Sequence, residues 1–284
     1  MTTYSSLASV GATRLRLAEL GLSTKKSLGQ HFLIDDGVVG KILRLAAVEP
    51  GSTVIEIGPG IGTLTEALLH EDLKLTAVEI DSSLIAGLQE RFDALTLINA
   101  DALAPATIKS LRDLAPTALV ANLPYAVAAT IILEYFQSLP SLTATTVMVQ
   151  REVGERIAAQ PGSKDYGAFT VKLGLLAEAK GQFKVQAQCF YPPPRVDSSV
   201  IRLERKASYS NQVETASWLA DAAFFQRRKT IKNSICAYFE EHGLSTEQLD
   251  RLFAEANIDP ACRGETLSTG DYMNLATVQT SFGR

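Results

Sequence analysis

The stretch Thr53–Gly62 reads TVIEIGPGIG and largely decides the fold of this chain. Its first half is mostly apolar and β-branched, which is typical of a buried strand. The glycines that follow let the backbone turn sharply and approach a ligand where a side chain would collide. An apolar helical pattern continues over residues 64–69. The sequence therefore predicts a strand, a ligand-binding loop and a helix in direct succession.

The same alternation continues along the first two thirds of the chain. Apolar runs predict further strands at 75–78, 95–98, 118–121 and 145–149, with helices at 84–92, 108–114, 128–136 and 167–178. Strands that alternate with helices form a parallel, doubly wound sheet. Two strands, 183–190 and 199–203, then follow without a helix between them. This terminal hairpin predicts an α/β fold with the Rossmann-like, seven-stranded sheet of class I methyltransferases.

The pattern changes after Arg205. A polar stretch over 206–212 precedes helical patterns at 213–225, 228–240, 246–255 and 269–277, and no strand signal follows. We therefore expect three parts. They are an N-terminal extension over 1–24 that contains a helix at 13–20, an α/β domain over 25–205, and a small all-helical domain over 206–284.

Composition narrows the class of protein. Of the 284 residues, 46% are hydrophobic and 20% are charged, as in an ordinary globular protein. No apolar run approaches the roughly 18 residues that a membrane helix requires. The cysteines and histidines show no paired or ligand-like spacing, so neither a disulfide scaffold nor a metal site is expected, and a cytoplasmic protein is indicated. An organelle transit peptide stays open, since no acid precedes Glu19.

Charge is distributed unevenly along the chain. The net charge of −4 argues mildly against nucleic-acid binding, because phosphate contacts depend on Lys and Arg. The segment 222–235, however, contains no acid and four cations: Arg227, Arg228, Lys229 and Lys232. Such a run is usually a solvated helix face. Its position beside Phe224 and Phe225 favours an RNA-facing surface.

Two acids follow the next two strands. Glu79 ends a strand about 20 residues after Gly58, the place of the acid that binds ribose hydroxyls in nucleoside-binding sheets. Asp101, just after the following strand, is placed to accept a hydrogen bond from an adenine amino group. A nicotinamide-dependent dehydrogenase would use the same loop and acid. Thr63, however, stands at the third glycine of the dehydrogenase fingerprint, which weakens that alternative.

The segment Asn122–Tyr125, NLPY, ends the fourth predicted strand. Ligands of parallel sheets lie at the carboxyl ends of the strands, so these residues face a bound nucleoside. The Asn122 amide oxygen and the Leu123 backbone carbonyl can each accept one hydrogen bond from adenine N6. They would thereby aim its lone pair at a sulfonium methyl group without a metal or a strong base. Tyr125 offers a stacking face for a flipped-out base.

Motifs along the whole chain resemble those of the ribosomal RNA adenine N6-dimethyltransferase family. They are KKSLGQHFL at 25–33, the glycine loop, VEID at 78–81, NLPY at 122–125, FYPPPRVDS at 190–198 and FQRRKT at 225–230. Together, in this order, they are highly specific. The forms at 29–33 and 227–230 favour a bacterial enzyme that acts on the small ribosomal subunit.

This resemblance implies S-adenosylmethionine as the methyl donor and no metal. It implies donor-pocket roles before the first sheet strand and at the strand ends, for His31, Leu33, Gly58, Glu79, Asp101 and Asn122. His31 stands where many relatives carry Asn. A contact through the His31 backbone would survive that difference, because it does not use the side chain. Phe190 is expected to stack on the target adenine opposite Tyr125.

The resemblance further implies dimethylation of two adjacent adenosines in the loop near the 3′ end of small-subunit ribosomal RNA. The expected partner is this RNA within a pre-ribosomal small subunit, with a monomeric enzyme and no membrane contact. A large-subunit enzyme that confers macrolide resistance and a non-catalytic ribosome-assembly factor stay open as alternatives.

Overall fold

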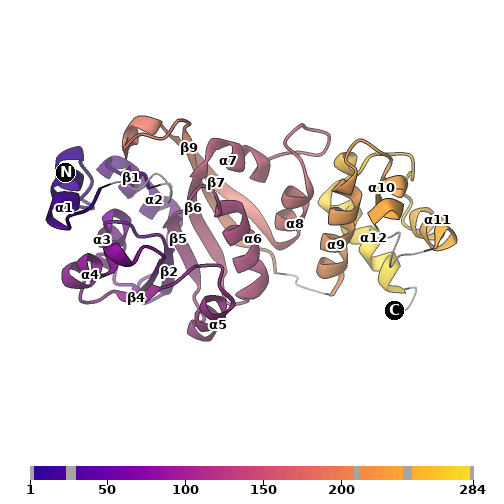
Figure 1. The fold of residues 1–284 in the computed structure, drawn as a ribbon. Helices are drawn as coiled ribbons and strands as arrows, with labels where there is room; N and C mark the ends of the chain where they lie inside the picture. The colour runs from indigo at the N-terminus through magenta and orange to yellow at the C-terminus, as the bar shows by residue number, and fades with distance from the viewer. Residues whose placement is uncertain (1–2, 24–29, 208–210, 239–244, 282–284) are drawn as a thin grey trace. The chain divides into compact units, whose positions relative to one another are not determined.

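The computed structural model describes residues 3–23, 30–207, 211–238 and 245–281 (Figure 1). The chain folds into two compact units, Met1–Gly154 with Ala179–Arg205 and Glu155–Glu178 with Lys206–Arg284. The break at Arg205 falls where the sequence pattern changes, whereas residues 155–178 group with the helical unit. Residues 25–29 of the KKSLGQHFL motif lie outside the described residues.

A seven-stranded sheet organises the first unit. Its strands are β2 (Thr53–Ile57), β3 (Lys74–Glu79), β4 (Thr96–Asn99), β5 (Ala118–Asn122), β6 (Ala144–Gln150), β7 (Ala177–Val185) and β9 (Ser198–Arg205). The strand order is β4-β3-β2-β5-β6-β9-β7. The strands from β4 to β6 are parallel to one another, and β9 is antiparallel to β6. The predicted Rossmann-like methyltransferase fold is confirmed.

Helices connect the parallel strands, as crossovers between parallel strands require. They are α3 (Thr63–Leu69), α4 (Ser82–Arg91), α5 (Pro105–Leu114) and α6 (Ala128–Ser138), preceded by α1 (Val10–Glu19) and α2 (Asp36–Ala46) and followed by α7 (Arg151–Ile157). All four crossover helices lie where the sequence predicts them. The sequence does not predict α2, because Gly37 and Gly40 weaken its helical pattern.

One edge of the sheet differs from the sequence prediction. The expected strand 183–190 is instead the end of β7, a 3-10 turn (Ala187–Cys189) and a short strand, β8 (Phe190–Tyr191). β7 already begins at Ala177, where the prediction continued the helix that the structure ends as α8 (Ala168–Leu176). Residues 178–184 are mostly exposed at the end of the strand order. Their polar composition suits an edge strand, but it hides the apolar alternation by which a strand is recognised.

The strand β8 pairs with β1 (Phe32–Leu33) in a separate two-stranded ladder. Phe32 lies opposite Tyr191, and Leu33 lies opposite Phe190. This antiparallel ladder joins the KKSLGQHFL motif to the FYPPPRVDS motif, which lie far apart in the sequence. The residues that precede the sheet are thereby held beside the residues that precede its last strand.

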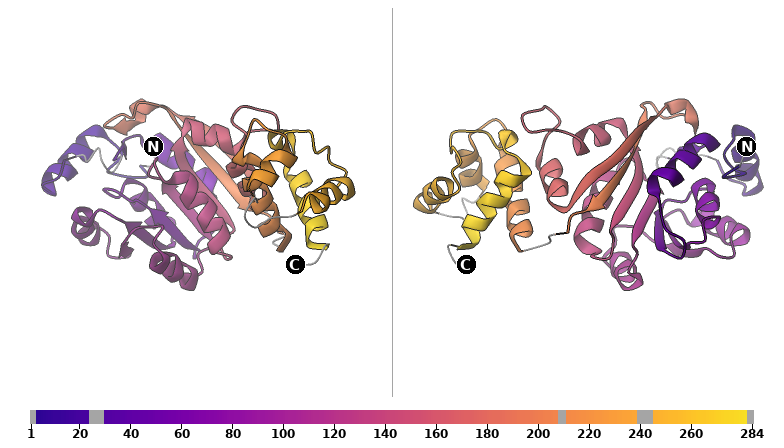
Figure 2. Two further views of the ribbon diagram at one scale, coloured as in Figure 1. Left: turned by 45° about the vertical axis from the view of Figure 1, so that its right-hand side comes forward. Right: turned by 180° about the vertical axis from the view of Figure 1, so that it is seen from behind.

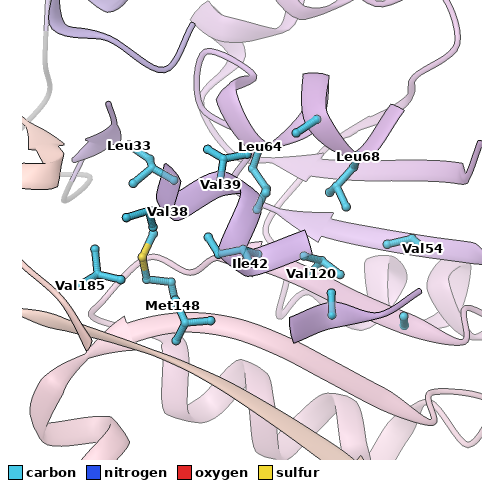
Figure 3. Packing of buried hydrophobic residues seen from close by; sticks show 14 of the residues in the cluster. Leu33, Val38, Val39, Ile42, Val54, Leu64, Leu68, Val120, Met148 and Val185 are labelled. Carbon is cyan, nitrogen blue, oxygen red and sulfur yellow. The ribbon is translucent and has the colours of Figure 1, made fainter. Parts of the chain in front are cut away.

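A continuous apolar core supports these elements. Figure 3 shows Leu33, Ile42, Leu64, Val120 and Met148 packed together from β1, α2, α3, β5 and β6. Each of these side chains is almost completely buried. Burial of one such side chain contributes roughly 1.5–3 kcal/mol, so this core fixes where the strand ends and the glycine loop lie.

The second unit is helical, as Figure 2 shows. Its helices include α8, α9 (Asn211–Phe225), α10 (Ile231–Tyr238), α11 (Thr246–Glu255) and α12 (Thr269–Ser281). The helix predicted from Arg228 begins only at Ile231, and residues 226–230 form an exposed turn. Across the described ranges, no helix is both long and apolar enough to cross a membrane.

Candidate active site

The carboxyl ends of the central strands open into one cavity of about 600 Å³. This volume lies within the roughly 300–1,000 Å³ that is usual for small-molecule sites. The cavity is lined by all six residues predicted for a donor pocket and by three of the four predicted to act on the target base, with Asn122 in both sets: His31, Leu33, Gly58, Glu79, Asp101, Asn122, Leu123 and Tyr125. The structure thus brings together residues from β1, the glycine loop and the ends of three parallel strands.

The glycine loop takes a backbone course that other residues rarely adopt. Gly58, Gly60 and Gly62 have φ values of 69°, 61° and 94°. A Cβ on Gly60 would lie 3.0 Å from the Phe32 ring, so glycine also allows a close approach there. The Gly58 N–H donates to the Val78 carbonyl at 2.9 Å, which ties the loop to the neighbouring strand.

Glu79 is held in a defined orientation at the end of β3. Its carboxylate accepts the Asp81 N–H at 2.9 Å and the Gly60 N–H at 3.3 Å. The side chain is 6% exposed, and burial raises the pKa of Glu79 above its ordinary value. The carboxylate therefore links the β3 turn to the glycine loop within the cavity wall, where a ribose diol could be bound.

A second buried acid, which the sequence reasoning did not assign, lines the same cavity. Glu56 accepts the Thr65 hydroxyl at 2.7 Å, and burial raises the pKa of Glu56 to about 8. Thr63 also lines the cavity, and its hydroxyl oxygen is buried without a hydrogen-bond partner among the described residues. The sequence signal that could have identified both residues is their position in or beside the glycine motif.

Asn122 is fixed by the segment that precedes α2. Its amide nitrogen donates to the His31 carbonyl at 3.2 Å, which leaves the amide oxygen as the acceptor. The His31 backbone carbonyl, which was expected to contact the donor, accepts this hydrogen bond from Asn122. The His31 ring contacts the Pro192 carbonyl through Nδ1 at 2.7 Å.

Tyr125 lies in the cavity wall, and both its ring and its hydroxyl contact other side chains. The His31 ring stacks on it, with centroids 5.8 Å apart and planes inclined by 23°. The Tyr125 hydroxyl and the Ser198 Oγ are 2.7 Å apart. Burial raises the pKa of the phenol, so it stays neutral at physiological pH. Ser198 ends the FYPPPRVDS motif, and this motif therefore helps to orient the stacking ring.

Phe190, which was expected to stack on the target adenine, lies in the apolar core in this structure. Its side chain is 1% exposed and packs in the apolar core with Leu33 and Met148. It is not among the described residues that line the cavity. The ladder between β1 and β8 is the reason, because it points this side chain into the core.

The predicted RNA-binding cations lie in the second unit, around the turn between α9 and α10. Arg227 forms an ion pair with Glu265 at 2.7 Å and donates to the Lys164 carbonyl at 2.8 Å. Lys232 forms an ion pair with Asp250. Arg228 and Lys229 are exposed and have no ion pair with another described residue.

The strand order and the nucleoside-sized cavity at the strand ends define a class I methyltransferase. Residues 21–276 match the model of the family described as "Ribosomal RNA adenine dimethylase". The chain belongs to this family of S-adenosylmethionine-dependent enzymes that methylate ribosomal RNA.

Curated relatives agree with this assignment, and solved structures share the fold. A "Ribosomal RNA small subunit methyltransferase A" of Thermobifida fusca is 40% identical, with 91% of each chain covered. One of Staphylococcus epidermidis is 38% identical over 98% of each chain. A dimethyladenosine transferase structure from Plasmodium falciparum has a TM-score of 0.74 at 23% identity, covering 89% of this chain and 98% of that chain. A 23S rRNA methyltransferase structure, ErmE, has a TM-score of 0.63 at 24% identity, covering 87% and 98%.

Proposed function

We propose that this enzyme dimethylates N6 of two adjacent adenosines in the 3′-terminal hairpin loop of small-subunit ribosomal RNA. The observation that carries this proposal is the position of Asn122, Leu123 and Tyr125 in the same cavity as Glu79 and Asp101. A base positioned by the first three residues would meet a donor held by the two acids. We further propose that the enzyme acts as a cytoplasmic monomer on a pre-ribosomal particle.

The cavity, here called the donor pocket, has the polar groups that S-adenosylmethionine would need. The Glu79 carboxylate, oriented by two backbone N–H groups, can accept both hydroxyls of a ribose. Asp101, whose Oδ1 accepts the Leu103 N–H at 2.9 Å, retains acceptor capacity for an adenine amino group. The buried Thr63 hydroxyl lacks a partner among the described residues, and a polar group of the donor would satisfy it.

The chemistry asked of the protein is the activation of a poor nucleophile. When bound, S-adenosylmethionine supplies an electrophilic methyl group on a positively charged sulfur. The Asn122 amide oxygen and the Leu123 carbonyl would accept the two N6–H bonds and localise the nitrogen lone pair. A nitrogen–carbon bond would form as the sulfur–carbon bond breaks, the neutral thioether would leave, and the proton released from N6 would pass to solvent. Because Asn122 is already fixed through His31, little reorganisation is required.

Tyr125 is the proposed stacking partner of the target adenine. The His31 ring lies over it in this structure, so a base would use the opposite face or displace the imidazole. The proposed role of Phe190 on the other side of the base requires its side chain to leave the core. Stacking through Phe190 would therefore need a rearrangement of β8, whereas stacking on Tyr125 would not.

The choice between ribosomal subunits rests on the relatives. The curated relatives at 38–41% identity are named for the small subunit. The solved 23S rRNA methyltransferase shares the fold at 24% identity, and the fold alone does not distinguish the two RNAs.

We assign RNA recognition outside the donor pocket to Arg227, Arg228, Lys229 and Lys232 of the helical unit.

The test is a direct one. The enzyme is incubated with labelled S-adenosylmethionine and, in parallel, with unmethylated small subunits or unmethylated large subunits, and the modified bases are mapped by mass spectrometry. We expect N6,N6-dimethyladenosine at two neighbouring positions of the small-subunit RNA alone. Modification of the large subunit would establish the alternative substrate, and no modification of either RNA would favour a non-catalytic assembly factor.

A further inference from the structure

We infer that the N-terminal segment Tyr4–Leu22, here called the strap, positions helices α3 and α4 and thereby sets the affinity of the donor pocket. Nearly all of the strap lies before the region matched by the family model, which begins at residue 21. No described residue of the strap lines the donor pocket, so the strap acts on the donor through packing. This inference rests on the donor site proposed above.

Two carboxylates anchor the start of the strap. The Tyr4 and Ser5 N–H groups donate to Asp36 at 3.0 and 2.8 Å. The Ser5 hydroxyl and the Ser6 N–H donate to Glu66, each at 2.8 Å. Hydrogen bonds to ionised acceptors are stronger than neutral ones. The strap is therefore bound to α2 through Asp36 and to α3 through Glu66.

An arginine of α4 completes the same network. Arg91 donates to the Ser6 hydroxyl at 2.7 Å and forms an ion pair with Glu66 at 3.0 Å. Hydrogen bonds from the two serines and from Arg91 lower the pKa of Glu66, despite its partial burial. One carboxylate thus holds the strap, α3 and α4 together.

Helix α1 of the strap contacts α4 at a glycine of that helix, Gly87. Arg16 donates to the Gly87 carbonyl at 2.7 Å. A Cβ on Gly87 would overlap the Leu20 side chain, and a Cβ on Gly40 of α2 would overlap the Tyr4 ring. Glycine inside a helix is unfavourable relative to alanine. Its presence at both contact points is therefore explained by the room that it leaves for the strap.

The helices that the strap holds are the ones that carry pocket residues. Leu64 of α3 lines the donor pocket, and Glu66 follows two residues later. Leu84 of α4 lines the donor pocket, and Gly87 follows less than one turn later. If release of the strap lets either helix shift, the pocket wall therefore moves with that helix.

An apolar cluster provides a second connection. Leu7 and Leu17 of the strap pack with Phe32, Leu84 and Leu88, all nearly buried. Phe32 and Leu84 are pocket residues, and Phe32 also lies against the glycine loop. Loss of the two strap leucines would remove packing partners of Phe32 and Leu84. Because packed interiors are dense, such a gap shifts its neighbours.

The first experiment displaces the strap by a substitution on α4. Gly87→Leu introduces a side chain that a small movement of Leu20 cannot accommodate. We expect its affinity for S-adenosylmethionine, measured by calorimetry, to fall by about fivefold or more, as for typical coupling between sites. The matched control is Gly11→Leu in α1, where a Cβ meets nothing within 4 Å and the residue is exposed. That variant should bind the donor like the wild type.

The second experiment uses only the wild type, so it holds even where Gly87→Leu fails to fold. Coupling is reciprocal, and a donor that binds tighter with the strap in place must also hold the strap in place. We expect S-adenosylmethionine to slow hydrogen exchange in the peptide that contains the Tyr4, Ser5 and Ser6 amides. At saturating donor the exchange of these amides should slow by about fivefold or more, the same coupling between donor and strap.

The outcomes separate this inference from the proposed function. Two results would overturn the inference and leave the strap as a stabilising element only. One is unchanged donor affinity in a folded Gly87→Leu variant, and the other is a rate of hydrogen exchange in the strap that stays the same when the donor is added. Neither result affects the assignment of Asn122 or of the RNA substrate. Absence of donor binding by the wild type would contradict both the donor site and the inference.

Discussion

The donor pocket and the basic turn (residues 226–230) both contain residues that the sequence singles out, but they are built differently. Glu79 is almost buried and accepts two backbone N–H groups, and Asn122 is fixed by a backbone carbonyl. Arg228 and Lys229 are exposed on a turn. Arg227 is already paired with Glu265.

The difference between fixed, buried groups and exposed side chains follows from the functions proposed for the two regions. A methyl transfer requires a few groups held in one geometry, since misplacement of reacting atoms is costly. Contact with RNA phosphates depends on charge near the surface and tolerates mobile side chains. We therefore expect substitutions in the pocket to act on chemistry and donor binding, and substitutions in the basic turn to act on RNA affinity.

The largest effect is expected for Asn122→Ala. Methyl transfer should fall by about 10²–10³, the usual cost of one preorganised transition-state acceptor. The fold should remain, since a polar residue at a strand end adds little to the core. Single-turnover transfer to unmethylated small subunits measures this rate, with donor and RNA affinities determined in parallel. Asn122→Asp keeps an acceptor and should be slow but active. Near-normal turnover in the Ala variant would remove Asn122 from the mechanism.

Donor binding should be the property most affected by Glu79→Ala. The ribose would lose charged acceptors worth about 1.5–3 kcal/mol each, so donor affinity should fall by at least tenfold. Calorimetric titration with S-adenosylmethionine measures this loss. RNA affinity should stay at the wild-type level, which serves as the internal control. Unchanged donor affinity would show that the ribose lies elsewhere.

The basic turn allows a sharper comparison within itself. Arg228→Ala with Lys229→Ala should weaken RNA binding and lower the slope of log affinity against log salt by roughly 0.7–0.9 for each lost phosphate contact. Lys232→Ala, which removes a cation already paired with Asp250, should change the slope less. Binding of small subunits at several salt concentrations measures both. If the double variant kept the wild-type slope, the turn would be a solvated surface.

The last prediction concerns the stability of the fold and the second acid of the pocket, Glu56. The pKa of Glu56 is raised from 4.5 to about 8 in the folded chain. Its contribution to stability is therefore present below pH 4.5 and is lost as pH rises through 8. The free energy of unfolding should decline with pH over this range by about 1 kcal/mol per unit more than in Glu56→Gln. Urea unfolding of both proteins at pH 6 and pH 8 tests this, and parallel pH profiles would contradict it.

Local sequence signals predicted much of the pocket. The glycine loop directly follows a strand, and Glu79 and the NLPY segment lie at strand ends, so their place at the sheet edge comes with the fold. The residues that the sequence left unassigned, Glu56 and Thr63, have no distinctive pattern of their own. Their burial depends on α3 and on the neighbouring strands.

What the sequence alone determined is therefore the alternation of strands β2 to β6 with their crossover helices, and the residues at the strand ends, because both depend on periodicity and on turn chemistry within a few positions. Only the tertiary structure decided which side chains meet across long separations. It buried Phe190 through the β1–β8 ladder and paired Arg227 with Glu265. It also bound Ser5 and Ser6 to Glu66. Such contacts form between surfaces that exist only after the chain has folded, so no local pattern encodes them.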